Sequence, residues 1–184
     1  MIYIALLRGV NVGGNNKLKM ADLKRSLESI GFKRVQTYIQ SGNVLFESDE
    51  SHLPKEDARS LEARMEEHIR TEYGITTRVI LRSADEWERI VTACPFDEEA
   101  IAAAHSLHVT LLGGSPTERE LELLRSVEGL GDDYRLIGLE LYVLYGKSVL
   151  DSKLSVVLQK FKTPSSARNW NTMQKLLEMA RAMR

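Results

Sequence analysis

A glycine-rich, cationic stretch over residues 7–19 has the residue types and spacing best suited to chemistry in this chain, Leu-Arg-Gly-Val-Asn-Val-Gly-Gly-Asn-Asn-Lys-Leu-Lys. It follows an apolar run typical of a strand, at residues 2–7, and precedes a helical pattern that begins near Met20. Backbone N–H groups of such a turn and the N-terminus of the next helix can jointly hold an anion. The stretch therefore predicts a phosphate or carboxylate site in which Arg8 pairs with the anion. The backbone N–H groups expected around that anion are those of Gly9, Gly13 and Gly14.

The same stretch does not have the residues of a nucleoside-triphosphate-binding loop. Gly9 and Gly14 are spaced as in G-x-x-x-x-G, but Asn15 and Asn16 stand where a Lys and a Ser or Thr must contact phosphates and Mg²⁺. Lys17 comes two residues too late for that role. A nucleoside triphosphatase is therefore not expected, and a simpler anion site is the prediction that stands.

The elements of the first half predict which residues lie beside this stretch. Strand and helix patterns alternate in the order βαββαβ, which is the ferredoxin-like unit. The predicted elements are a strand at 2–7, a helix from Met20 that Gly31 stops, a hairpin of 35–40 and 44–47, a helix from Pro54 that Gly74 closes, and a strand at 76–82.

In this topology the first and third strands are antiparallel neighbours, so the end of the first strand lies beside the turn of the hairpin. We expect one end of the sheet to collect side chains that hydrogen-bond a polar or anionic ligand: Arg8, Asn11, Lys17, Gln40, Ser41 and Asn43. A structural explanation of the same residues stays open. Gly and Asn supply positive φ in turns, and Arg8 can cap carbonyl groups or pair with a carboxylate.

The second half repeats the pattern in a weaker form. A capping-box sequence at Ser83 begins a short helix, and a polar linker follows. A second strand with a glycine exit begins at Leu107, and a second capping box, at Thr117, precedes a helix and another hairpin that turns near Gly138. We predict an α+β protein of two ferredoxin-like subdomains, 1–82 and 107–184, joined by a connecting helix and linker at 83–106. The second copy is expected to be degenerate, with helices at about 153–161 and 169–182 and no fourth strand.

A second polar cluster precedes the last predicted helix, at residues 164–172. Ser165, Ser166 or Asn169 is expected to cap that helix, and Trp170 to anchor it on the core. If this segment folds back over the loop-bearing end of the first subdomain, three further residues join the predicted ligand site: Lys153, Arg168 and Asn169.

Composition limits the class of protein and of partner. The chain has 184 residues, a net charge of −1 and a sequence pI near 6.4, which argues against a protein that mainly coats nucleic acid or an anionic membrane. A single cysteine, Cys94, suits a reducing compartment, and no apolar run approaches the roughly 18–20 residues of a membrane span. The start lacks the basic region of a signal peptide. We therefore expect a cytoplasmic protein with no membrane partner.

No metal site or cofactor is predicted. Cys94, His105 and His108 do not have the spacing of a zinc site, and His52 and His68 lie in polar surroundings typical of solvated side chains. No serine can be assigned a neighbouring base from the sequence, so catalytic residues, reaction class and oligomeric state are not predicted.

Two alternatives to a small-molecule site remain. One is an RNA-binding module that stacks bases on the sheet face around Tyr3, Tyr38 and Phe46, although the third strand lacks the basic-glycine-aromatic pattern of such modules. The other is an interaction protein without a ligand, in which the motif residues stabilise the fold.

Four motifs, in this order along the chain, resemble those of a bacterial family, the domain-of-unknown-function family 1697. They are Leu7-Arg8-Gly9-Val10-Asn11-Val12-Gly13-Gly14, Thr37-Tyr38-Ile39-Gln40-Ser41-Gly42-Asn43-Val44, Ser152-Lys153-Leu154 and Ala167-Arg168-Asn169-Trp170-Asn171-Thr172. The resemblance implies two ferredoxin-like subdomains, in agreement with the predicted element order. It implies no activity, substrate or catalytic residue.

Overall fold

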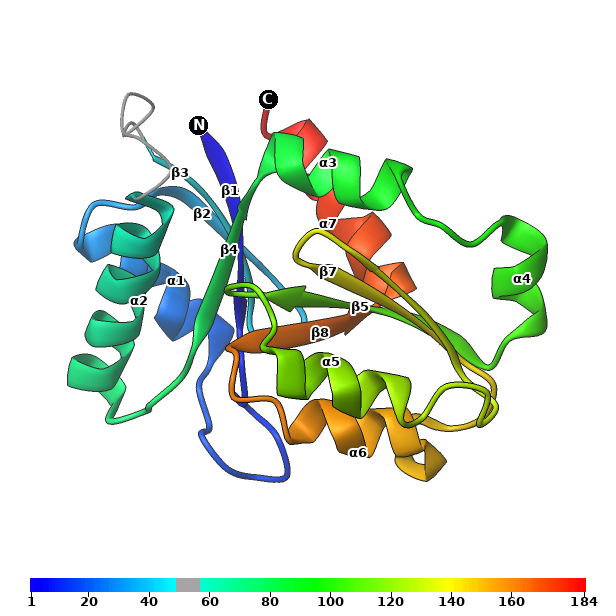
Figure 1. The fold of residues 1–184 in the computed structure, drawn as a ribbon. Helices are drawn as coiled ribbons and strands as arrows, with labels where there is room; N and C mark the ends of the chain where they lie inside the picture. Colours follow the sequence, from blue (N-terminus) through cyan, green and yellow to red (C-terminus); the bar gives the residue numbers. More distant parts are fainter. Residues whose placement is uncertain (49–56) are drawn as a thin grey trace. The chain divides into compact units, whose positions relative to one another are not determined.

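The computed structural model describes residues 1–48 and 57–184, which form two units. The first unit consists of Met1–Arg89 together with Lys175–Arg184, and the second unit consists of Ile90–Gln174. The predicted helix start at Pro54 and the side chain of His52 lie outside the described residues. Figure 1 shows the helices and strands of both units.

The first unit has a four-stranded antiparallel sheet in the order β2-β3-β1-β4. Its elements are β1 (Ile2–Leu7), α1 (Met20–Ser29), β2 (Lys33–Tyr38), β3 (Asn43–Glu47), α2 (Asp57–Tyr73), β4 (Val79–Ser83) and α3 (Ala84–Thr92), the last of which ends in the second unit. This order confirms the predicted ferredoxin-like topology, with β1 antiparallel to its neighbours β3 and β4.

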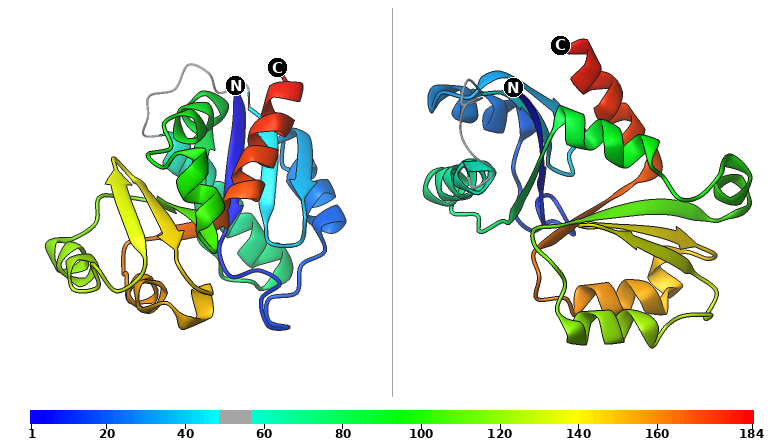
Figure 2. Two further views of the ribbon diagram at one scale, coloured as in Figure 1. Left: turned by 90° about the vertical axis from the view of Figure 1, so that its right-hand side faces the viewer. Right: turned by 45° about the horizontal axis from the view of Figure 1, so that its top comes forward.

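Helices α1 and α2 cover one face of this sheet (Figure 2). The buried residues of α1 recur at helical spacing, Met20, Leu23 and Leu27, and pack in one core with Phe46 of the sheet. Helix α1 ends as predicted. Gly31 has φ +97°, and the Phe32 N–H donates to the Leu27 carbonyl at 3.3 Å, which is the long hydrogen bond of a Schellman motif.

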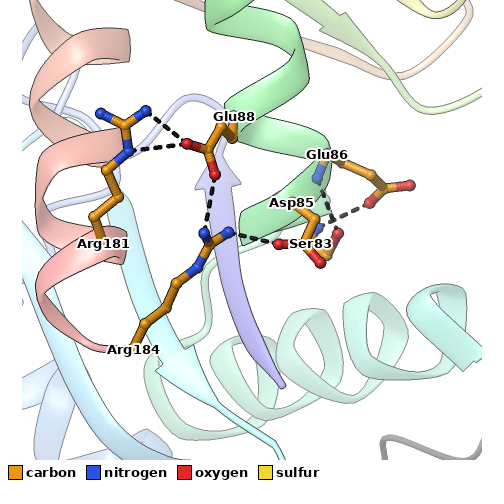
Figure 3. A network of polar contacts seen from close by, with 6 residues as sticks. All are labelled: Ser83, Asp85, Glu86, Glu88, Arg181 and Arg184. Carbon is orange, nitrogen blue, oxygen red and sulfur yellow. Dashed lines mark hydrogen bonds and ion pairs between the residues drawn. The ribbon is translucent and has the colours of Figure 1, made fainter.

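Helix α3 and the end of α7 (Trp170–Ala182) lie on the other face of the first sheet (Figure 2). The side chains that alternate with the first core, such as Ile4 and Leu6, are also fully buried, as is Trp87 of α3. Figure 3 shows the ionic network between the two helices: Arg181 donates twice to one Glu88 oxygen, at 2.6 and 3.0 Å, and Arg184 donates to the other at 2.9 Å. These hydrogen bonds lower the pKa of Glu88.

The second unit has its own four-stranded antiparallel sheet, in the order β6-β7-β5-β8. Its elements are α4 (Glu98–Ala103), β5 (Ser106–Leu112), α5 (Glu118–Arg125), β6 (Asp133–Ile137), β7 (Glu140–Tyr145), the 3₁₀ helix η1 (Val149–Asp151), α6 (Lys153–Gln159), β8 (Ser165–Asn169) and the start of α7. Buried residues of α5 and α6, such as Leu124 and Val157, pack with Leu141 and Val143 of β7.

The second copy has a fourth strand, so the prediction that it ends without one was wrong. Strand β8 pairs with β5, with Ala167 opposite Thr110 and Arg168 opposite Val109. The segment Ser-Ser-Ala-Arg-Asn contains no β-branched or aromatic residue, and it becomes a strand because it completes the edge of a sheet. The predicted capping role of Asn169 is confirmed, since its Oδ1 accepts from Thr172 N–H at 2.9 Å.

Hydrogen bonds at the ends of β1 and β5 show that the two units repeat the same backbone frame. Leu7 N–H donates to Gly42 O at 2.8 Å, and Arg8 N–H to Arg78 O at 2.9 Å. In the second unit Leu112 N–H donates to Leu139 O at 2.8 Å, and Gly113 N–H to Pro164 O at 2.7 Å. Gly113 thus has the backbone position in the second unit that Arg8 has in the first.

No helix within residues 1–48 and 57–184 combines the length and the apolar composition that crossing a bilayer requires.

Candidate functional site

The loop between β1 and α1, residues 8–19, folds back on itself as a small hairpin and is called the 8–19 loop below. Asn11 N–H donates to Asn16 O at 3.0 Å, and Asn15 N–H donates to Val12 O at 2.9 Å. Between Val12 and Asn15 the two glycines have φ +57° and +79°, the left-handed values of a type I′ turn. The conformation of this turn is therefore sufficient to explain why residues 13 and 14 are glycines. The turn lies several residues before the start of α1.

The side chain of Asn11 fixes the 8–19 loop in place. Its Oδ1 accepts from Leu18 N–H at 2.8 Å, and its Nδ2 donates to Leu18 O at 2.8 Å and to Gln40 O at 2.7 Å. The last of these bonds joins the loop to the turn between β2 and β3. The structure therefore brings the 8–19 loop and this turn together, as the ferredoxin-like topology leads us to expect.

The turn between β2 and β3 can approach β1 closely because Gly42 has no side chain. A Cβ atom there would lie 2.6 Å from Val10 Cγ2 and 2.8 Å from Leu7 Cβ, and the φ of +82° favours glycine in any case. Asn43 is fully buried, and its Nδ2 donates to Tyr38 O and to Ser41 Oγ, both at 2.9 Å. The amide of Asn43 thus shapes the turn from inside.

Ile39, in the same turn, has a backbone conformation that its side chain disfavours. Its φ is +49°, which a β-branched residue rarely adopts, and 51% of the residue is exposed. An exposed side chain gains little from packing, so the rest of the turn must impose this conformation. Such strained positions are found more often at functional sites than elsewhere.

Arg8 and Lys17 are the predicted site residues of the first unit whose charged groups remain available. Both are exposed, and within residues 1–48 and 57–184 neither forms an ion pair or a side-chain hydrogen bond. The backbone of Arg8 is held on both sides, since its N–H donates to Arg78 O and its carbonyl accepts from Thr77 Oγ1 at 2.8 Å. The 8–19 loop contains three basic and no acidic side chains, so its charge is positive.

The other predicted site residues differ in what they can offer. Gln40 is exposed, and Ser41 is half-buried with its Oγ accepting from Asn43. Asn11 and Asn43 use their amide groups for the loop and the turn. Gly9 has φ +72° with open space around its Cα, which leaves room for a group to approach its backbone.

Lys153, Arg168 and Asn169 belong to the second unit. Lys153 is the exposed first residue of α6, and Asn169 caps α7. Arg168 is half-buried, its Nη1 donates to Ser166 Oγ at 3.1 Å and to Ala167 O at 2.7 Å, and burial lowers its pKa to about 10. Their membership of the predicted ligand site stays a prediction.

Phe46, which the RNA alternative needs on an open sheet face, lies in the core. It is fully buried, its ring centroid lies 4.7 Å from that of Phe32 in an edge contact, and it stacks on Tyr3 at 5.6 Å. Phe46 therefore stabilises the packing of α1 and α2 on the sheet and offers no surface to a base.

Titratable side chains elsewhere in the described residues form neither a metal site nor an activated thiol. Among the described residues no three His, Cys, Asp or Glu side chains come together as a metal site. Burial raises the pKa of the Cys94 thiol and lowers that of His108, whose ring makes an edge contact with Tyr145 at 5.2 Å. Both shifts favour the neutral forms.

Sequence reasoning missed one contact, between Ser26 of α1 and His68 of α2. Ser26 Oγ lies 2.5 Å from His68 Nε2. Each residue directly precedes a buried apolar residue of its helix, Leu27 and Ile69, so both lie at the edge of the packed surface. That position is the signal that could have placed the two side chains near each other.

Comparisons with known proteins give a family and a fold. Residues 1–142 match the model of a family described as "Protein of unknown function (DUF1697)". The conserved bacterial protein SP0830 from Streptococcus pneumoniae has a similar solved structure, with a TM-score of 0.77 and 23% identity over 97% of this chain and 98% of that one. At that identity the likeness shows the fold alone. No curated protein matches the chain.

Proposed function

Because the chain belongs to the DUF1697 family of proteins of unknown function, we propose a function from its own residues: it binds a small molecule or nucleotide that carries a phosphate or carboxylate, at the 8–19 loop. The observation that carries the proposal is that the charged groups of Arg8 and Lys17 are available to a ligand. Both cations are exposed and without an acidic partner in the described residues, on a loop that Asn11 holds in one conformation.

This arrangement suits anion binding for two physical reasons. A loop that is already ordered loses less conformational entropy when a ligand binds than a free loop would. The guanidinium of Arg8 can donate two parallel hydrogen bonds to a phosphate or carboxylate, and Lys17 adds a second positive charge. In the proposal Gly9, Gly13 and Gly14 supply backbone N–H groups, and Gln40 and Ser41 contact the polar part of the ligand.

A thermal-unfolding screen tests the proposal directly. The probes are inorganic phosphate, adenosine monophosphate, glucose 6-phosphate and a short RNA, each at low and high salt. A ligand at about 100 times its Kd stabilises the folded state by about 2.7 kcal/mol, which raises Tm by several degrees. We expect such a rise with at least one small phosphate compound, its loss in Arg8→Ala, and its weakening in Lys17→Ala.

Lys24→Ala is the matched control, since Lys24 is an exposed lysine on α1 outside the 8–19 loop. This variant should keep the full ligand response. A rise in Tm that persists in Arg8→Ala, or no rise with any probe, contradicts the proposal. A response to RNA alone that falls steeply with salt would favour the RNA alternative. Loss of stability in Arg8→Ala without any ligand would favour a structural role.

A further inference from the structure

Ser26 and His68 meet between α1 and α2, in a part of the first unit that the proposed anion site does not use. Ser26 Oγ lies 2.5 Å from His68 Nε2. This is the contact that a general base makes with the hydroxyl it activates, and it is the first geometric requirement for a serine nucleophile. The two residues come from different helices and are 42 positions apart in the sequence.

Ser26 also lines a groove that a small molecule could occupy. The groove has a volume of about 440 Å³ and is lined by Asp22, Arg25, Ser26, Ser29, Glu72 and Tyr73. Its volume lies within the range of known small-molecule sites, roughly 300–1,000 Å³. Ser26 is half-buried, so its hydroxyl is held by the helices while solvent can still reach the residue.

The charged side chains around the groove are two carboxylates and one guanidinium. The carboxylates are those of Asp22 and Glu72. Arg25, which pairs with Asp22 at 2.5 Å, is the cation of the groove and can face negative charge that develops on a bound carbonyl oxygen.

We propose that Ser26 is a nucleophile activated by His68, and that the groove accepts small carboxylic esters that are uncharged or cationic. Ser26 Oγ forms a bond to the ester carbonyl carbon while its proton passes to His68 Nε2. The bond from that carbon to the alcohol oxygen then breaks, and the alcohol leaves with the proton from His68. Water attacks the acylated Ser26 and gives a proton to His68, and the acid is released as Ser26 regains its hydrogen. The two carboxylates of the groove make anionic esters poor substrates.

Covalent labelling of the intact chain tests this step. A biotinylated fluorophosphonate probe reacts with activated serines, and peptide mass spectrometry locates the adduct. We expect one adduct, on Ser26, and none in Ser26→Ala. His68→Gln should slow labelling, and the hydrolysis of p-nitrophenyl acetate, by about a hundredfold, as loss of a general base does. Ser126→Ala is the matched control, because Ser126 is an exposed helix-end serine outside the groove whose Oγ donates to Leu123 O at 2.6 Å, as Ser29 Oγ does to Ser26 O.

The wild-type mapping decides the question even if a variant fails to fold. No adduct, or an adduct on another serine, overturns the proposal. Equal labelling rates for folded His68→Gln and wild type overturn it as well, since the serine would then react without the histidine. Circular dichroism of each variant shows whether it is folded.

Discussion

The two units connect their first strand to the following helix in different ways. In the second unit residues 113–116 suffice, and α5 begins with a complete capping box: Glu120 N–H donates to Thr117 Oγ1 at 3.2 Å, and Thr117 N–H donates to Glu120 Oε2 at 3.0 Å. In the first unit the connection is the longer 8–19 loop, and Lys19, the N-cap residue of α1, forms no side-chain capping hydrogen bond. The fold itself is therefore satisfied by a short connection, and the additional residues of the first unit need another explanation.

The neighbouring residues differ in the same way. Arg8 and Gly113 form equivalent backbone hydrogen bonds, so the frame does not need the side chain of Arg8. The carbonyl groups of Gly42 and Leu139 accept equivalent hydrogen bonds, from Leu7 and Leu112. Only Gly42 lies under a loop that leaves no room for a Cβ atom. The first unit thus carries a tightly packed loop and an exposed cation on a backbone frame that the second unit forms without them.

Gly42→Ala should have the largest effect on stability. The new Cβ would lie 2.6 Å from Val10 Cγ2 at a φ of +82°, so overpacking and backbone strain add to a loss of about 3 kcal/mol in the free energy of unfolding. Urea denaturation measures this loss. Gly14→Ala separates the two causes, because φ is +79° there but no atom lies within 4 Å, and it should cost about 1 kcal/mol. Equal losses would show that packing against Val10 is unimportant.

Asn11→Ala should have the next largest effect, about 2 kcal/mol, because three hydrogen bonds are lost and the backbone N–H of buried Leu18 loses its acceptor. Hydrogen exchange should also become faster in the 8–19 loop and leave 113–116 unchanged. Asn16→Ala, which removes a single exposed bond to Gly9 O at 3.0 Å, serves as the comparison. An equal loss in both variants would contradict the central role of Asn11.

Glu120→Gln should cost about 1–2 kcal/mol at neutral pH, since Glu120 accepts hydrogen bonds from Thr117, Lys162 and Thr163. Burial acts to raise the pKa of Glu120, but these hydrogen bonds outweigh it and lower the pKa below the ordinary value of a glutamate. Its stabilising contribution is therefore present above the unfolded pKa and is lost as pH falls through the folded pKa. Urea denaturation should show a larger difference between wild type and variant at pH 7 than at pH 3.

The contribution of Glu62, in the first unit, to stability should have the opposite pH dependence. It accepts from Leu81 N–H at 2.8 Å, but burial is the larger influence and raises its pKa. Its contribution is present below the unfolded pKa and is lost as pH rises through the folded pKa. The free energy of unfolding of wild type should therefore exceed that of Glu62→Gln by more at pH 3 than at pH 7. The same pH trend for both variants would show that the two carboxylates are not distinguished in this way.

Arg8→Ala should have the smallest effect on stability, within about 0.5 kcal/mol without a ligand, because its side chain is exposed and the backbone N–H of Gly113 forms the equivalent bond without a side chain. Thermal unfolding without added anions measures it. A loss of more than 1 kcal/mol would mean that the first unit depends on Arg8 in a way that the second does not depend on Gly113.

Periodicity and turn residues were enough to predict most of the fold. Leu23 and Leu27, the stop at Gly31 and the two capping boxes are local features, and each formed as expected. Strand β8 was missed because its residues have little strand preference and pair only when β5 is already in place.

The candidate site was predictable only in part. Topology places the 8–19 loop beside the hairpin turn, but it does not show that Asn11 forms the link to Gln40 or that Arg8 has no acidic partner in the described residues. The contact between Ser26 and His68 depends on how two helices pack, which a single sequence does not specify.

The division of the first unit between the two ends of the chain affects the order in which the protein can form during synthesis. Residues 90–174 are made after the first sheet and before Lys175–Arg184, a delay on the order of ten seconds at the usual rate of translation. During that time the buried residues of α7, among them Leu176 and Ala180, have not been synthesised and cannot pack on the face of the first sheet that includes Ile4 and Leu6. The first unit to leave the ribosome is therefore the last to be completed, and a nascent chain stalled before Lys175 would expose an apolar sheet face to chaperones and proteases.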